Sequence, residues 1–97
     1  MKEVKRGEIW LVNLDPTIGH EIKKSRPAVI IQNDLGNKFS PLTILAPITS
    51  QNTEKLYPVE VLLNKKNSGL EKESKALFNQ IRSVDKSRLK RQQSKNN

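Results

Sequence analysis

Short apolar segments alternate with polar segments along most of this chain. Several of them are rich in β-branched residues and are bounded by Gly, Pro, Asn or Asp, a pattern typical of strands. They predict strands over residues 8–14, 26–32, 41–48 and 57–63. In the last segment an apolar residue recurs at every second position, so we expect one strand face to carry Val59, Val61 and Leu63.

The C-terminal third continues this pattern. Residues 75–84 predict one or two further short strands, and Asp85 is a suitable N-cap for a short helix over residues 86–91. The aromatic residues lie mostly in strand patterns, which favours core positions over an exposed stacking platform. They are Trp10, Phe39, Tyr57 and Phe78.

Prolines and turn formers separate the strands. Pro41 and Pro47 in the third segment indicate an edge strand or a bend near Pro47. Residues 33–38 form a cluster of turn formers, and residues 64–73 are turn-like and charged. Short strands divided by such turns predict a mainly β fold, a small barrel or a sandwich.

Composition narrows the class of protein. A chain of 97 residues is expected to form one domain. The absence of cysteine excludes a disulfide framework and zinc–thiolate sites, and one histidine leaves little for a transition-metal site. The apolar runs are too short for a membrane span, and the N-terminus lacks a signal-peptide pattern. We therefore expect a soluble, cytoplasmic protein.

The charge of the chain points to its partner. Eighteen Lys and Arg against ten Asp and Glu give a net charge of +8. This excess favours a polyanionic partner, nucleic acid first and an acidic protein second, while a solvated basic surface is the plain alternative. After Asp85 the chain has cations and no acid. That end either binds phosphates or only solubilises a frayed terminus, and the sequence favours neither.

One arginine stands at the junction between a polar loop and a predicted strand. Pro27 fixes its own φ and biases Arg26 toward an extended backbone, so the strand limits where the guanidinium can go. An arginine stays charged at any relevant pH and can grip phosphate oxygens with two parallel hydrogen bonds. Arg26 is therefore suited to stabilise a phosphorane during RNA cleavage.

Other polar side chains also fall at loop–strand junctions, and RNA cleavage would give each a role. Glu21 or His20 could move protons between the 2′-hydroxyl and the 5′-oxygen, and Thr49 could hydrogen-bond the phosphate. Each residue also has an ordinary structural interpretation. His20 could be a solvated loop residue, and Glu21 could pair with a neighbouring lysine. Thr49 could belong to a turn, and Gln80, at another such junction, could bond a backbone group at a strand end. Spacing alone gives no enzyme signature.

At these residues the sequence resembles the MazF/PemK toxins of bacterial toxin–antitoxin modules. The resemblance covers about residues 6–89, and its blocks all follow the family order. They are Arg6-Gly7-Glu8-Ile9-Trp10, the loop with Asp15-Pro16, Gly19 and Glu21, the segment from Ser25 to Asp34, Ala46-Pro47-Ile48-Thr49-Ser50, and the segment from Gln80 to Leu89.

The resemblance implies an SH3-like barrel, a homodimer, and a metal-independent endoribonuclease that cuts single-stranded mRNA at short sequences. It implies no cofactor, and it implies inhibition by an antitoxin with an acidic disordered segment. Arg26 and Thr49 match the family's two catalytic positions, Glu21 an accessory acidic position, and Gln80 a position near the bound bases. The remaining candidates for RNA contact are His20, Lys23, Lys24, Ser50 and Arg82. We predict the substrate's own 2′-hydroxyl as nucleophile.

Two departures from the family pattern bear on this prediction. His20 stands where a small polar residue is more usual, and the chain stops at Asn97, where family members continue into an amphipathic helix. We expect that helix to be shortened, with one barrel domain over residues 1–91 and a disordered basic tail over residues 92–97. Two alternatives are a gyrase poison like the related CcdB toxins and an RNA-binding barrel without catalysis.

Overall fold

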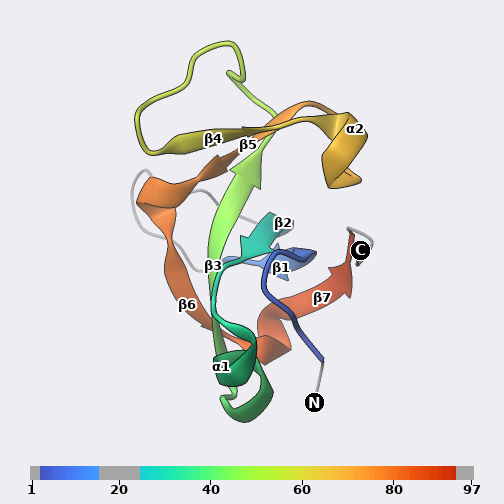
Figure 1. The fold of residues 1–97 in the computed structure, drawn as a ribbon, viewed down its shortest axis with the longest axis vertical. Helices are drawn as coiled ribbons and strands as arrows, with labels where there is room; N and C mark the ends of the chain where they lie inside the picture. The colour runs from blue at the N-terminus through green and yellow to red at the C-terminus, as the bar shows by residue number, and fades with distance from the viewer. Residues whose placement is uncertain (1–2, 16–24, 94–97) are drawn as a thin grey trace.

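Strand β3 connects the two halves of this molecule, whose computed structural model describes residues 3–15 and 25–93 (Figure 1). The described residues form seven strands, two short α-helices and two 3-10 helices. The strands are β1 Ile9–Asn13, β2 Ser25–Ile30, β3 Leu42–Thr49, β4 Glu60–Leu63, β5 Ser74–Leu77, β6 Arg82–Asp85 and β7 Leu89–Gln92. The helices are α1 Asp34–Phe39, α2 Lys65–Ser68, η1 Phe78–Gln80 and η2 Lys86–Arg88. The predicted mainly β fold is confirmed.

All strand pairs are antiparallel, in the order β4-β5-β3-β2-β1-β7, with β6 also on β3. On the side of β3 that faces away from β2, residues 42–45 pair with β6. Residues 48 and 49 on the same side pair with β5. Pro47 falls between the two partners. Because β3 has neighbours on both sides, the edge strand is the wrong one of the two predicted alternatives, and the bend near Pro47 stays a prediction. The proline is tolerated inside the sheet because its missing N–H lies where β3 exchanges one neighbour for the other.

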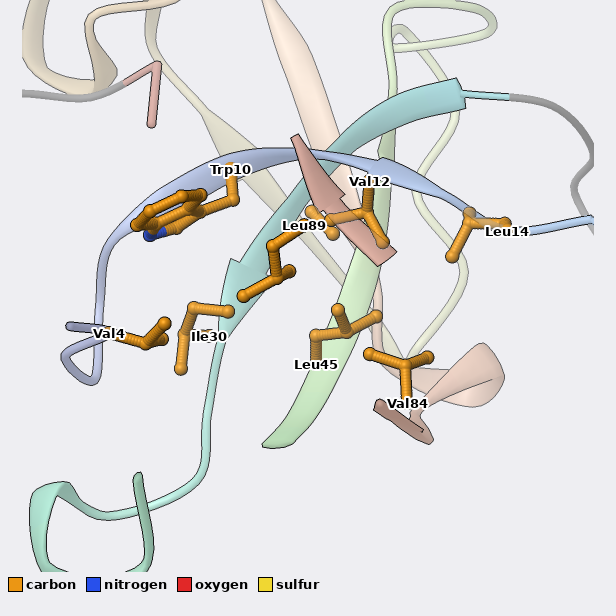
Figure 2. Close-up of a cluster of buried hydrophobic side chains, with 9 residues drawn as sticks. Val4, Trp10, Val12, Leu14, Ile30, Leu45, Val84 and Leu89 are labelled. Atoms are coloured by element: carbon orange, nitrogen blue, oxygen red, sulfur yellow. The ribbon is translucent and has the colours of Figure 1, made fainter. Parts of the chain in front are cut away.

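The larger core lies between the strands of the barrel. It takes the inward residues of β1, β2, β3, β6 and β7, at every second position, together with Val4 from the N-terminal segment. Figure 2 shows these side chains converging from different strands. The cluster comprises Val4, Trp10, Val12, Leu14, Ala28, Ile30, Leu45, Val84 and Leu89. β6 pairs with β3 and β7 pairs with β1, and the single turn of η2 joins these two strands, so the sheet curls around this cluster as in an SH3-like barrel.

A second, smaller cluster lies on the opposite face of the sheet and joins the β4–β5 hairpin to it. Its buried members are Ile9, Ile48 and Ala76, and partly buried Phe78 packs against them. Trp10 is buried in the larger core, where its ring nitrogen donates to Glu8 Oε1 at 3.0 Å. Core positions are thus found for two of the four aromatic residues.

The other two aromatic residues contradict the prediction. Phe39 is 71% exposed and Tyr57 is 53% exposed. Phe39 ends α1, and Tyr57 precedes β4 instead of belonging to it as predicted. The expected core position is therefore wrong for both side chains.

Both predicted turn clusters contain a short helix, which corrects the sequence interpretation. The side chain of Asn33 accepts a hydrogen bond from the Gly36 backbone N–H at 2.8 Å and caps α1. Asn64 caps α2 in the same way, and Gly69 ends it with a φ of 80°. Asparagine favours turns and N-caps for the same reason, a short side chain that bonds nearby backbone, so the pattern did not separate the two.

The C-terminal segment begins with the predicted N-cap and short helix, but its later residues form a strand instead of continuing the helix. Asp85 caps η2 by accepting from the Ser87 N–H, and this bond lowers the pKa of Asp85 below its ordinary value. The helix ends at Arg88, however, and residues 89–92 form β7 because buried Leu89 belongs to the core. Gln92 pairs with β1 and the Gln93 N–H donates to Ile9 O, so the predicted tail starts too early. Residues 94–97 lie outside the described residues.

A buried ion pair fastens the β4–β5 hairpin. Lys75 Nζ lies 2.8 Å from Glu60 Oε1, and the two side chains are only 5% and 7% exposed. Lys75 also donates to Lys55 O at 3.1 Å, and the Tyr57 N–H donates to Glu60. The hydrogen bond from Lys75, followed by that from Tyr57, lowers the pKa of Glu60 against the opposing effect of burial.

This pair makes the fold sensitive to acid. Because its folded pKa lies below the ordinary 4.5, ionised Glu60 stabilises the fold above about pH 4.5, and that contribution is lost as the pH falls through the folded pKa. We expect Glu60→Gln to melt at a lower temperature than wild type near pH 6, and the gap to narrow toward about pH 3. Thermal melts across this range measure it. A gap that stays constant would contradict the prediction.

Candidate functional site

Arg26 and Thr49 lie just beyond the last pair of the ladder between β2 and β3. This ladder pairs Ile30 with Leu45 and ends at Ala28 and Pro47, and its register, extended by two residues, brings Arg26 and Thr49 opposite one another. The Ile31 N–H donates to Ile44 O, so hydrogen-bonded pairs alternate from there. Arg26 and Thr49 then fall at a non-hydrogen-bonded position, where opposite side chains lie closest.

Both side chains stand at the end of the barrel core. Every second residue of β2 faces the larger cluster, so half-buried Arg26 follows buried Ile30 and Ala28 on that face. On the other side of β2, Arg26 pairs with Val12, a core residue with no exposed surface. The backbone of this half-buried arginine is therefore anchored by packed strands.

The Thr49 hydroxyl is oriented by the turn that follows β3. The Gln51 N–H donates to Thr49 Oγ1 at 3.2 Å. The hydroxyl accepts that bond and keeps its own proton available for donation, for example to a phosphate oxygen. Ser50 is exposed and, as the next residue, points to the other face.

Two arginines bind the end of β1 at the same end of the barrel. Arg82 starts β6 opposite Leu45, and its Nη1 donates to Leu14 O at 3.1 Å. Arg88 Nη1 donates to Asn13 O at 3.3 Å and also to Asp15 O. The two guanidinium groups thus donate hydrogen bonds to three consecutive backbone carbonyls. We call Arg82, Arg88 and the carbonyls of residues 13–15 the arginine clamp.

The clamp fixes the backbone next to Arg26 and brings positive charge to it. Asn13 pairs with Ser25, the residue before Arg26. Carbonyl oxygens are neutral partners, so the hydrogen bonds leave the guanidinium charges available to attract a polyanion. Sequence reasoning named Arg82 only as an RNA contact and missed Arg88, whose single signal was its place in the basic C-terminal run.

The other predicted site residues either lie farther along the chain from Arg26 and Thr49 or fall outside the described residues. Gln80 is half-buried in η1, two residues before Arg82. Glu21, His20, Lys23 and Lys24 lie outside the described residues. Within residues 3–15 and 25–93, no three His, Asp or Glu side chains gather where they could hold a metal ion. In the same residues, no helix is long and apolar enough to cross a membrane.

The fold and the positions of these residues define a MazF-like toxin barrel. MazF from Deinococcus radiodurans (crystal form I) matches with a TM-score of 0.80 and 29% sequence identity, over 98% of this chain and 83% of that one. A MazE–MazF structure from the same organism (form II) matches with a TM-score of 0.72 and 25% identity, over 98% of this chain and 81% of that one.

Sequence comparison gives the family directly. Residues 5–96 match the family described as the PemK-like, MazF-like toxin of type II toxin–antitoxin systems, and the chain belongs to this family. Endoribonuclease EndoA of Bacillus subtilis (strain 168) is 44% identical over 86 residues, which cover 89% of this chain and 74% of EndoA. The membership predicted from the sequence is confirmed.

The arginine clamp should contribute to stability. Arg88→Ala removes hydrogen bonds from a charged donor to two carbonyls, and such bonds contribute about 1.5–3 kcal/mol each at most, less at a half-exposed site. We expect the melting temperature to fall by about 4–8 °C for each kcal/mol lost. Thermal denaturation measures it, with Arg6→Ala, at an exposed arginine, as the control. Equal melting temperatures for the two variants would contradict the clamp.

Proposed function

We propose that this toxin is a metal-independent endoribonuclease that cuts single-stranded mRNA at short sequences. The observation that carries the proposal is the β2–β3 register, because its extension by two residues beyond Ala28 and Pro47 brings a strand-anchored arginine opposite a hydroxyl at the basic end of the barrel. The name of the B. subtilis relative supports the same activity. A gyrase poison or a barrel that only binds RNA has no need of such a pair.

The substrate supplies its own nucleophile in this mechanism. The 2′-hydroxyl attacks the adjacent phosphorus, the bond to the 5′-oxygen breaks, and the products carry a 2′,3′-cyclic phosphate and a 5′-hydroxyl. Nucleophile and phosphorus are already tethered, so the enzyme needs mainly to align them and to stabilise charge. Arg26 holds the non-bridging oxygens, and Thr49 donates to the phosphate or fixes the 2′-hydroxyl.

Proton transfer completes the reaction. In the proposal, Glu21 accepts or delivers the proton, His20 is the second candidate, and Lys23 and Lys24 contact phosphates. Ser50 and Gln80 contact the RNA beside the cleavage position. Arg82 contributes charge through the clamp, which is a more indirect role than the predicted RNA contact.

The partners follow from the exposed surfaces and the charge. Leu42, Ile44 and Ile81 are exposed on the outer side of β3 and at the start of β6, an apolar area suited to a homodimer interface. The net charge of +8 favours an antitoxin with an acidic segment. The MazE–MazF structures show such a toxin with its antitoxin. Cleavage of mRNA places the protein in the cytoplasm.

The identity of the nucleophile can be tested without changing the protein. A 2′-deoxy substitution at the nucleotide 5′ to the scissile phosphate should abolish cutting, because it removes the attacking oxygen, while binding changes little. Gel analysis of the products should show 5′-hydroxyl ends, and cutting of the unmodified RNA should survive EDTA. Cutting of the deoxy substrate, or a product with a 5′-phosphate, would show that water is the nucleophile.

Arg26 should be needed for catalysis and not for folding. We expect Arg26→Ala to lower the cleavage rate by about 10²–10³-fold, as losing one transition-state donor does. Arg26→Lys should recover only part of the rate, because a point charge does not reproduce the planar fork. Single-turnover kinetics with Arg6→Ala as the matched control measure this. A lysine variant with wild-type rate would show that only charge is required.

A further inference from the structure

A pocket of about 440 Å³ lies next to the Arg26–Thr49 pair, on the other face of the same two strands. Pro27 and Ser50 line it, and each follows one of the two site residues by a single position. Successive side chains of a strand point to opposite faces. The strand ends of β2 and β3 therefore carry the cleavage site on one side and this pocket on the other.

The pocket is built from segments that are far apart in the sequence. Besides Pro27 and Ser50 it is lined by the segment between α2 and β5, with Glu71 and Lys72, by Ser74 at the start of β5, and by the C-terminal end of the described chain, with Arg91 and Gln93. Ser74 is buried and its hydroxyl donates to Lys72 O at 3.0 Å, which leaves its oxygen lone pairs as acceptors. Figure 1 shows the end of β7 facing the α2 side of the hairpin.

These groups match the chemistry of a nucleobase. Hydroxyls and an amide supply both donors and acceptors in a small space, and a Gln amide can bond a base edge with two hydrogen bonds. A guanidinium plane such as that of Arg91 can stack on an unpaired base, which is how proteins read single-stranded RNA. Lys72 adds a cation for the neighbouring phosphate.

We propose that this pocket binds one unstacked base of the RNA substrate beside the scissile phosphate and so sets one position of the cleavage sequence. The inference rests on the proposed function. A nucleotide that leaves the Arg26–Thr49 pair needs only to pass over the ends of β2 and β3 to reach Pro27 and Ser50. Gln93 and Arg91, which share the face of Pro27, determine specificity at that position, and Ser50 lies beside them.

The chain offers a matched control for the test. Arg91 lines the pocket, whereas the preceding cation, Lys90, is exposed on the same strand and does not line it. Wild type, Arg91→Ala, Gln93→Ala and Lys90→Ala are each incubated with one long RNA, and all cut ends are sequenced. In the two pocket variants we expect a single position of the cleavage motif to lose its preference. Lys90→Ala should keep the wild-type motif.

Kinetics on the preferred sequence should separate binding from chemistry. For Gln93→Ala we expect KM to rise roughly tenfold, as for loss of one base contact. The rate at saturating RNA should change much less, because Arg26 and Thr49 are intact. Binding of the uncleavable 2′-deoxy RNA, followed by fluorescence anisotropy with each base changed in turn, gives the same information without cutting. Thermal melts verify that both variants fold.

An unchanged motif and unchanged affinity in both pocket variants would overturn the proposal. Weaker inhibition by antitoxin with an unchanged motif would also overturn it and would assign the pocket to a peptide. Failure of the proposed function is a separate outcome: wild-type protein would then not cut RNA at all. In that case base-selective binding that is lost in Gln93→Ala would still support the pocket.

Discussion

The antiparallel register between β2 and β3 is the constraint on which the site depends. Ile30 faces Leu45 across this ladder, and both side chains are almost fully buried. A slip of one residue would turn each strand's apolar residues out of the core, so packing holds the register firmly. The same register carries Arg26 to its place opposite Thr49. The same strand register therefore determines both the packing of the core and the geometry of the site.

Cations are used in two different ways in this molecule. Lys75 is buried and paired with Glu60, so its charge is balanced within the fold and serves the β4–β5 hairpin. Arg82 and Arg88 instead donate to neutral carbonyls at the end of β1. Arginine suits this task because its fork binds backbone and remains charged. The barrel thereby gains rigidity and an electropositive end from the same residues.

Local sequence patterns predicted the strands better than the short helices. Apolar β-branched runs led to β1, β2 and β3 within a residue or two, because a half-buried strand needs such residues at those positions. The pattern failed at Asn33 and Asn64, where turn chemistry and helix capping use the same side chain. It failed again at Leu89, which continues a polar, helix-like segment in the sequence but is drawn into β7 by the core.

The sequence by itself determined the mainly β class, the basic character of the surface, the family, and Arg26 as a cation held by a strand. Each of these depends on residue type and on neighbours along the chain. Only the tertiary structure decided that the β2–β3 register brings Arg26 toward Thr49, that Arg82 and Arg88 bind three consecutive carbonyls between them, and that Pro27, Ser74 and Gln93 line one pocket. These relations join segments that are dozens of residues apart in the sequence. Strand pairing determines them, and local sequence patterns do not encode strand pairing.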